Sequence, residues 1–432
     1  MKKRVVITGV GALTAIGEGA EPLWSAVIQG KSAIDFMSLG GSAEGERGIA
    51  AARVPDFNPE KFVTQKKSLK LMARDIQLAV AGAALAVKDA RLAPSVASRN
   101  EATGLETTRD PERCGVIVGA GVLNHELDEL AASIGSSLDD AGRLDLKRFG
   151  EEGIPALFPL WLLKYLPNMP ACHISILFNF QGLNNTLTTG ATAGLQAAGE
   201  AFRIIQRGDA DLILAGGAES KVNPVGLSQY EALGALSKNA AEDPRSAYRP
   251  FDAAADGFVV GEGAGFLVLE EREHARKRHA NVYAEVVGFA SSSDTGREIA
   301  MQGALAEAGI TAGDLKYLQA CGIGLPEDDL KEIRAIQETF NGSSQNLCVG
   351  ASKPVTGFTG FAAGALDLVI SSLVLKNQIV PPLINFQKPR VPLGFRVMKE
   401  KTAEKIAYAM TNAFGFNGHS VSLVTKACGG LE

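Results

Sequence analysis

A turn of small residues at positions 186–200 has the composition of a nucleophile's setting but contains no nucleophile. It reads TLTTGATAGLQAAGE, in which Gly190 permits an unusual backbone conformation and Ala191 comes just before a helical pattern. A helix N-terminus presents unpaired N–H groups and a positive partial charge, so a thiol there ionises readily and a developing oxyanion finds donors. Ala191 supplies no reactive group. On pattern alone, the turn is typical of a closely packed buried helix.

The elements that must position this turn are predicted by its neighbours. Residues 184–187 can form a strand end, and the small residues 191–194 allow a helix to start pressed against neighbouring backbone. Elsewhere, strand-like apolar runs such as residues 5–10 alternate with helical patterns such as residues 74–88. This alternation indicates an α/β fold.

Bulk composition excludes several classes of function. A chain of 432 residues with 46% hydrophobic residues can bury a large core, and its 48 glycines suit close packing of helices on sheets. The net charge of −5 and the lack of a long basic block do not favour nucleic-acid binding. The five cysteines form no CxxC pair, and their odd number argues against a disulfide framework. We therefore expect a cytoplasmic protein.

Membrane, metal and cofactor sites are not predicted. Residues 2–4 are basic, but the apolar run after them is broken by glycine and reads as a first strand rather than a signal peptide. The apolar stretch 157–178 contains Lys164 and several prolines, so we expect it in the core or an interface rather than in a membrane. The five histidines show no metal-ligand spacing, and we expect no metal and no cofactor.

Long motifs in the same order as in one enzyme family run from about residue 4 to residue 426. They are VVITGVGAL at 5–13, GDADLILAGGAE at 208–219, RPFD at 249–252, DGFVVGEGAG at 256–265, Lys353 with Gly357, and NAFGFNGH at 412–419. With these motifs the chain resembles the β-ketoacyl-acyl-carrier-protein synthases, or ketosynthases, of the thiolase superfamily.

The resemblance implies an α/β thiolase fold, in which two pseudo-symmetric halves form five layers, αβαβα, and act as a dimer. We divide the chain into an N-terminal half at residues 1–250 and a C-terminal half at residues 251–432. Internal similarity agrees with this duplication, because residues 189–191 and the helix after them resemble residues 356–358 followed by a helix at 359–374.

Three reacting groups of an active ketosynthase are absent at the matching positions. The family's acyl-accepting cysteine falls on Ala191, its first histidine on Cys321 within QACGIGLP, and its second histidine on Phe358. Only the lysine of the last motif remains, as Lys353. Thioester formation needs a nucleophile, and decarboxylation needs donors that hold an enolate oxygen. Three separate losses indicate a ketosynthase-like subunit without its own condensation chemistry.

Cys321 has two interpretations. It could be a relocated nucleophile whose thiolate is favoured by the ammonium group of Lys353, or a small polarizable filler in a redundant pocket. We favour the filler, because no histidine is left at the matched positions to act as a base.

Other residues match the family's scaffold. Lys353, Glu262 and Asp256 are retained, and the resemblance implies that the lysine and nearby acids form a polar network behind the reacting groups. Phe414 and Phe416, together with Phe358, are expected to make the old cavity more apolar.

A basic segment precedes the helix predicted at residues 74–88. In active relatives a comparable segment docks the acidic acyl carrier protein, and Lys67 and Lys70 match positions within it. Leu71 stands where another basic residue would be expected, so a solvated helix start is the alternative.

The function we predict is that of a degenerate ketosynthase β subunit, or chain length factor, of a type II polyketide synthase. Such a subunit would pair with an active ketosynthase, would be inactive as an acyltransferase by itself, and would shape the tunnel that holds the growing polyketide, polyene or fatty-acid-like chain. Many members of that class carry glutamine where this chain has Ala191, which leaves the pathway open. The alternatives are a ketosynthase inactivated at its cysteine and a scaffold or binding subunit with no role in chain length.

Overall fold

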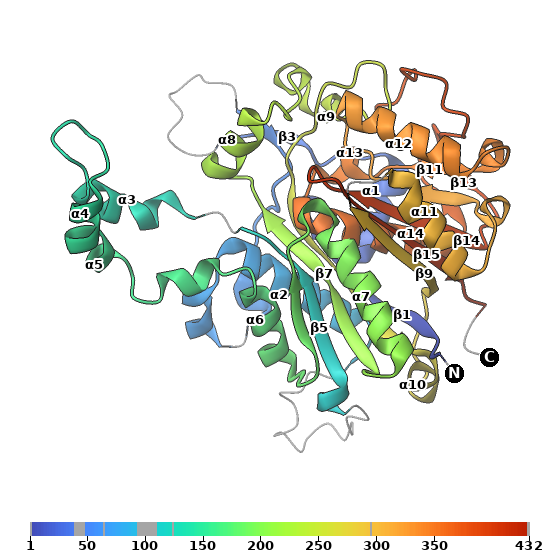
Figure 1. Ribbon diagram of the computed structural model, residues 1–432, viewed down its shortest axis with the longest axis horizontal. Coiled ribbons are helices and arrows are strands. Elements are labelled where there is room, and N and C mark those ends of the chain that lie inside the picture. The colour runs from blue at the N-terminus through green and yellow to red at the C-terminus, as the bar shows by residue number, and fades with distance from the viewer. Residues whose placement is uncertain are drawn as a thin grey trace.

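The architecture comes from a computed structural model that describes residues 2–38, 48–63, 65–92, 110–122, 125–293 and 296–429 (Figure 1). Its strands are β1 (Val5–Thr14), β2 (Gly17–Glu18), β3 (Asp35–Met37), β4 (Ile49–Ala51), β5 (Cys114–Gly119), β6 (Asn184–Leu187), β7 (Leu212–Ser220), β8 (Glu262–Glu271), β9 (Ala284–Ser293), β10 (Tyr317–Gln319), β11 (Cys348–Gly350), β12 (Ile379–Val380), β13 (Thr402–Ala403), β14 (Tyr408–Phe414) and β15 (His419–Ala427).

The α-helices alternate with these strands over most of the chain. They are α1 (Ala20–Gln29), α2 (Arg74–Asp89), α3 (Leu127–Ser136), α4 (Leu146–Arg148), α5 (Ile154–Ala156), α6 (Met169–Phe178), α7 (Ala193–Arg207), α8 (Pro224–Ala232), α9 (Pro244–Ala247), α10 (Arg272–Lys277), α11 (Arg297–Ala308), α12 (Pro326–Thr339), α13 (Lys353–Thr356) and α14 (Ala363–Asn377). The predicted strand at 5–10 and the predicted helix at 74–88 correspond to β1 and α2.

The main sheet consists of two layers with the same internal order. The first runs β6-β5-β7-β8-β1 and the second β11-β10-β14-β15-β9, and in each the first two pairings are parallel and the last two antiparallel. A short antiparallel pairing of β1 with β9 joins the layers. The predicted division after residue 250 stays a prediction.

Helices cover both layers and fill the space between them. Helices α7 and α14 lie in the middle and contact each other, α2 packs on the outer face of the first layer, and α11 packs on the outer face of the second (Figure 1). Helix α14 is buried along nearly its whole length. These five layers are the predicted thiolase fold, and that prediction is confirmed.

The duplication extends to the turns that begin the two central helices, but in a different register from the one predicted. The 3-10 turn η7 (Gly190–Thr192) leads into α7, and the 3-10 turn η11 (Gly360–Ala362) leads into α14. Both begin with a threonine and then a glycine of positive φ, +70° at Gly190 and +48° at Gly360. The counterpart of Ala191 is therefore Phe361, three residues after Phe358. The sequence similarity misled us because Gly357 also follows a threonine and also has a positive φ.

One long apolar helical segment has the length and composition of a membrane span. It covers Gly360–Asn377, and 83% of it is buried inside the protein. Since it packs between the two sheet layers, it acts here as a core helix.

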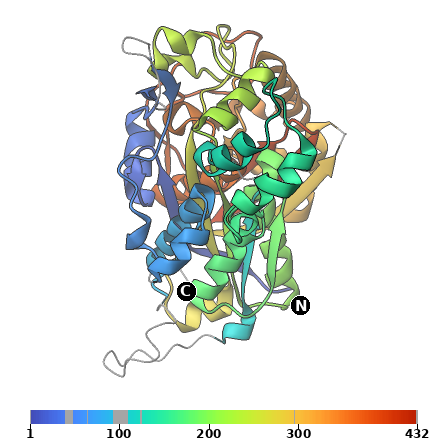
Figure 2. The same ribbon diagram turned by 90° about the vertical axis from the view of Figure 1, so that its left-hand side faces the viewer.

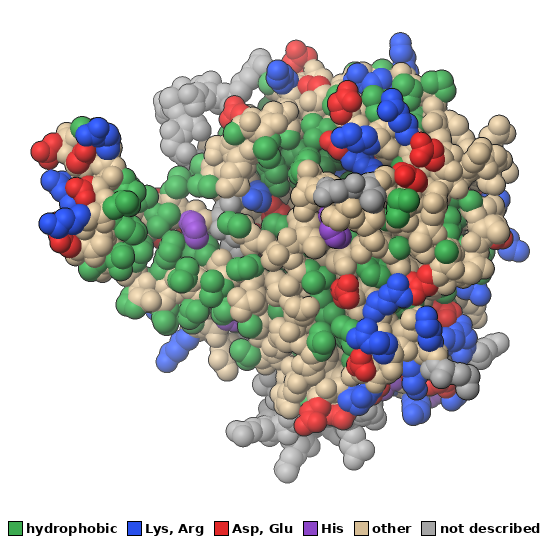
Figure 3. Space-filling model, in the orientation of Figure 1, with side chains coloured by type: hydrophobic (Ala, Val, Ile, Leu, Met, Phe, Trp, Pro, Cys, Tyr) green, Lys and Arg blue, Asp and Glu red, His purple; other side chains and the backbone are tan. Residues whose placement is uncertain are grey.

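An arm made of α3, α4 and α5 projects from the first half, away from the body (Figures 1 and 2). Many of its large apolar side chains are exposed, including Leu127, Leu144, Leu146 and Ile154. Hydrophobic side chains gather along the arm and on the adjoining flank of the body (Figure 3).

Candidate active site with its reacting groups replaced

The turn at Ala191 has the predicted geometry of a nucleophile's setting. Strand β6 ends at Leu187, Gly190 adopts a positive φ, and α7 starts directly against β5. Gly119 makes this approach possible, because a Cβ there would lie 2.4 Å from the backbone carbon of Ala193. The Thr192 hydroxyl donates to the Thr189 carbonyl over 2.8 Å and closes the turn.

The three positions predicted to have lost their reacting groups lie in or against one hydrophobic cluster, although they are distant in sequence. Cys321 and Phe358 are buried in one hydrophobic cluster, and Ala191 packs against it. The Phe358 ring lies 4.6 Å from the Phe258 ring and 6.0 Å from the Tyr230 ring, measured between centroids. Aromatic rings therefore surround residue 358, the position at which the resemblance places a histidine.

Phe414 and Phe416 were both expected to make the old cavity more apolar, but they lie in different surroundings. Phe414 is buried, and Arg297 lies over its ring, with 4.6 Å between the guanidinium carbon and the ring centroid. Phe416 is half exposed and reaches the Phe358 ring at 6.2 Å.

Cys321 is held as a buried thiol. Its Sγ atom lies 3.8 Å from the Phe414 carbonyl oxygen, and its backbone N–H donates to the Glu332 carboxylate over 2.8 Å. Burial raises the pKa of Cys321 to about 12, and the ammonium group of Lys353 offsets only part of this rise. The thiol therefore stays protonated near neutral pH, which supports the filler interpretation.

Lys353 forms a buried ion pair with Asp367, a partner that the sequence analysis did not predict. Its Nζ atom donates to Asp367 Oδ2 over 2.6 Å, and both side chains are buried. Ser352 and Gln319 donate to the other oxygen, Asp367 Oδ1. Asp367 is the only acidic residue in the largely apolar α14, and a lone buried acid in such a helix was the available signal.

Glu262 and Asp256 do not join this network, contrary to the expectation of one polar network around the lysine. Glu262 is fully buried and binds Arg74, with 2.8 Å between Arg74 Nε and Glu262 Oε2, and it also accepts from the Ser220 hydroxyl. Asp256 accepts from the Ser237 hydroxyl over 2.6 Å. The retained charges thus fall into three separate networks.

An apolar cleft of about 490 Å³ opens in front of Ala191. It is lined by Gly121, Val122, Pro167, Thr188, Gly190, Ala191, Phe361, Phe416 and Asn417. None of these lining side chains is a thiol, an imidazole or a carboxylate. The cleft can hold an apolar chain, but it offers neither a nucleophile nor a general base to that chain.

Two sequence families match the chain in succession. Residues 2–275 match the family described as the β-ketoacyl synthase N-terminal domain, and residues 279–387 match the β-ketoacyl synthase C-terminal domain. The chain belongs to the β-ketoacyl synthase family.

Similar proteins include both active-type synthases and a complex with a chain length factor. The 3-oxoacyl-[acyl-carrier-protein] synthase 2 of Staphylococcus aureus (strain COL) is 34% identical over 436 residues, with 98% of each chain covered. The structure of the ishigamide ketosynthase/chain length factor matches with a TM-score of 0.82 and 26% identity, covering 99% of this chain and 100% of that one. The structure of a type II PKS acyl-carrier protein in complex with its ketosynthase contains a chain that matches with a TM-score of 0.80 and 28% identity. The match covers 99% of this chain and 100% of that one.

The lysines predicted for carrier docking lie on a surface turn of this β-ketoacyl synthase fold. Lys67 and Lys70 are exposed on the 3-10 helix η2 (Lys66–Leu71), while Lys66 forms an ion pair with Glu60 at 2.5 Å. They project from the turn that precedes α2.

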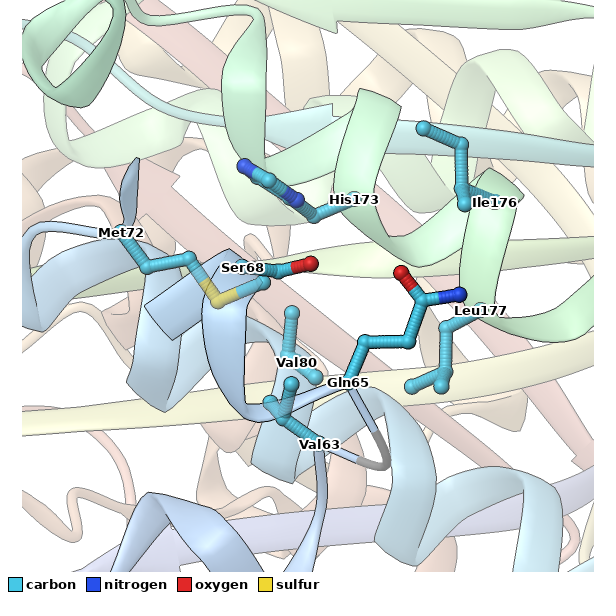
Figure 4. A pocket seen from close by; sticks show the side chains of 8 residues that line it. All are labelled: Val63, Gln65, Ser68, Met72, Val80, His173, Ile176 and Leu177. Atoms are coloured by element: carbon cyan, nitrogen blue, oxygen red, sulfur yellow. The ribbon is translucent and has the colours of Figure 1, made fainter. Parts of the chain in front are cut away.

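A small pocket of about 100 Å³ lies between this turn and α6 (Figure 4). Its lining residues are Val63, Gln65, Ser68, Met72, Val80, His173, Ile176 and Leu177. The His173 ring bonds to the Leu71 backbone, whereas its Nε2 atom is buried without a partner. Burial lowers the pKa of His173, so the ring is neutral and presents an acceptor to the pocket.

Proposed function

We propose that this chain is a non-catalytic β-ketoacyl synthase subunit that pairs with an active ketosynthase and forms part of the wall of its acyl tunnel. The observation that carries the proposal is the cleft at Ala191. The fold keeps the turn and an apolar cavity of about 490 Å³, yet all three reacting groups are replaced and two of the positions are buried. Such a cavity can contact a growing polyketide or fatty-acid-like chain without accepting it as a thioester.

The edge of the first sheet layer supports pairing with another subunit. Strand β6 ends the layer, and its residues Asn184 and Asn185 are exposed. The carbonyls of Leu183 and Leu187 accept bonds from β5, so the alternate residues Asn184 and Thr186 direct their backbone groups away from the sheet. The outward Thr186 N–H donates to the exposed side chain of Asn185 over 2.8 Å, which an incoming strand would have to displace. An exposed strand edge can accept a strand from another chain.

The apolar surface beside this edge supports the same interface. Exposed fractions are 75% at Val122, 73% at Ile176 and 60% at Leu162. Large exposed apolar patches mark interaction sites, and we assign this flank and the arm to the partner ketosynthase.

The acidic carrier protein would meet the complex at a basic surface. Lys67 and Lys70 provide exposed positive charge beside the pocket between η2 and α6, and no acidic residue lines that pocket. The five cysteines, which all lie within the described residues, form no disulfide, and this agrees with our proposal of a cytoplasmic location.

Co-expression with a ketosynthase that has the complete Cys-His-His set tests the pairing. We expect a heterodimer by native mass spectrometry, and we expect Thr186→Pro to abolish it by removing an outward donor while leaving the β5 ladder intact. Thr186→Val, which changes the same side chain but keeps the backbone N–H, is the matched control and should leave the dimer intact. Lack of a complex with the unaltered chain would refute the proposal.

The second candidate function is a ketosynthase inactivated at its cysteine. The 34% identity to a 3-oxoacyl-[acyl-carrier-protein] synthase 2 supports this candidate. Ala191→Cys separates the two. We expect this variant to remain inactive in condensation when incubated alone with acyl- and malonyl-carrier protein, because Cys321 and Phe358 supply no donors for the enolate. Condensation by the single variant would favour the second candidate.

A further inference from the structure

Phe361 stands in the second half at the position that Ala191 occupies in the first. Both residues follow a glycine of positive φ and open a 3-10 turn before a 15-residue helix. Both also line the same apolar cleft. The two halves therefore supply equivalent wall positions to one cavity, one with a methyl group and one with a phenyl ring.

The Phe361 ring has one close neighbour that restricts its position. It lies over Gly121, where an added Cβ would be 1.9 Å from the ring's Cζ atom. Any side chain larger than hydrogen at residue 121 would push the ring away from its seat. The adjacent Val122 also lines the cleft and is 75% exposed, so the ring stands at the inner side of an open wall.

Contacts at both its N–H and its carbonyl group hold the Phe361 backbone in place. Its N–H donates to the buried Glu219 carboxylate over 2.5 Å. Its carbonyl oxygen lies against two glycines, where added Cβ atoms would be 2.6 Å away at Gly194 and 2.4 Å away at Gly217. These contacts fix the point from which the Phe361 side chain enters the cleft.

We propose that Phe361 is a specificity-determining residue that limits the length of the acyl chain the cleft admits. The ligand class is a thioester-linked acyl or polyketide chain carried by the partner complex, and the inference rests on the function proposed above. The ring meets that chain through apolar contact, so the depth of the cleft follows the size of the side chain at residue 361.

The test measures the length distribution of products from the reconstituted heterodimer by mass spectrometry. We expect Phe361→Ala to shift the main product to a length at least one extension unit greater, and Phe361→Trp to shift it to a shorter one. Phe36→Ala, which changes a 39% exposed phenylalanine on β3 away from the cleft, is the matched control and should leave the length unchanged.

A second wall variant distinguishes failure of this inference from failure of the proposed function. If Asn417→Trp, at another residue that lines the cleft, changes product length while both Phe361 variants do not, the assignment of Phe361 is overturned and the chain-length role stands. If no variant at either residue changes the length in an intact heterodimer, both are overturned.

Binding by the isolated full-length chain provides a readout that needs no partner. Calorimetry with acyl-pantetheines of increasing chain length should show affinity levelling off at a shorter acyl chain for the unaltered protein than for Phe361→Ala. Gly121→Ala, which pushes the ring from its seat, should move this limit as well. Identical profiles for the unaltered chain and Phe361→Ala would overturn the inference.

Discussion

The turn that begins α7 and the turn that begins α14 share a backbone path but have different surroundings. Ala191 in the first opens onto a solvent-accessible cleft beside the exposed edge strand β6. The second turn lies next to the aromatic cluster around Phe358, and the edge strand of its half, β11, is buried. The Arg396 backbone covers that strand, donating to the Leu347 carbonyl and accepting from the Val349 N–H.

This difference shows how one duplicated fold divides its tasks. The second half closes its sheet edge with its own chain, whereas the first half leaves an edge and an apolar flank open. The proposed partner contact and the predicted nucleophile position at Ala191 therefore fall on the same half. The second half contributes large aromatic side chains, Phe358 inside the cluster and Phe361 at the cleft.

The largest effect should come from the closed cluster of the second half. Phe358→Ala is expected to destabilise the chain by about 3–5 kcal/mol, because it removes a ring that is only 2% exposed and leaves a cavity. Phe416→Ala, at a 50% exposed position bordering the first turn, should cost less than about 1 kcal/mol. Urea unfolding of both variants checks this order, and equal losses would contradict the contrast between a closed and an open turn.

A buried acid of the first half should make the stability of the chain depend on pH. Asp367 in the second half is paired with Lys353, whereas Asp75 in the first half is buried and accepts from the Ser220 backbone over 2.7 Å. Burial raises the pKa of Asp75 to about 7, and the nearby Glu219 charge adds to this rise.

The sign follows from proton linkage. Between about pH 4, the ordinary carboxyl pKa, and pH 7, the folded state binds more protons at Asp75 than the unfolded state does. Stability from this residue is therefore full below pH 4 and is lost as the pH rises to 7, by at most about 1.4 kcal/mol per pH unit. Asp75→Asn should reduce this slope in urea unfolding from pH 5 to 8, and an unchanged slope would contradict the pKa assignment.

The glycines at the crossing of α7 and α14 should both resist alanine. A Cβ at Gly194 would meet the Phe361 carbonyl oxygen at 2.6 Å, and a Cβ at its counterpart Gly364 would meet the Leu195 Cβ at 2.8 Å. Both obstacles move only with the backbone, so Gly194→Ala and Gly364→Ala should each destabilise the fold by about 1–3 kcal/mol despite the gain in helix propensity. Thermal unfolding measures both losses, and an unchanged stability of Gly194→Ala would show that the Phe361 backbone can shift.

The smallest effect is expected in chemical labelling, to which the buried thiol of Cys321 should not respond. With a pKa raised to about 12, its thiolate fraction at pH 8 is on the order of a thousandfold below that of an ordinary cysteine. Iodoacetamide followed by peptide mass spectrometry should therefore label the partly exposed Cys172 and leave Cys321 unmodified in the folded chain. Rapid labelling of Cys321 would revive its interpretation as a relocated nucleophile.

Much of the fold could be predicted from the sequence because its motifs are long and ordered. The strand at 5–10, the helix at 74–88 and the two-half architecture all follow from local pattern and family resemblance. The partner of Lys353 could not be predicted, since Asp367 meets the lysine only after α14 is packed between the layers. The grouping of Glu262 and Asp256 with Lys353 was wrong for the same reason, because retained charges have no stated neighbours until the loops are placed.

The register of the duplication shows the same limit. Residues 356–358 and 359–361 both offer a threonine, a glycine and a phenylalanine in nearly the same spacing, so local pattern cannot choose between them. The choice depends on which glycine stands at the start of the helix that crosses α7, and only packing establishes that.

The sequence by itself determined the family and the α/β architecture and predicted the loss of reacting groups at Ala191, Cys321 and Phe358, since these depend on residue identity in ordered motifs. Tertiary structure decided what fills the space those groups left. It placed Phe361 opposite Ala191, paired Lys353 with Asp367 and left β6 exposed while β11 is covered. The physical reason is that burial, pairing and cavity shape arise from contacts between segments far apart in the chain, whereas motifs record only neighbours along it.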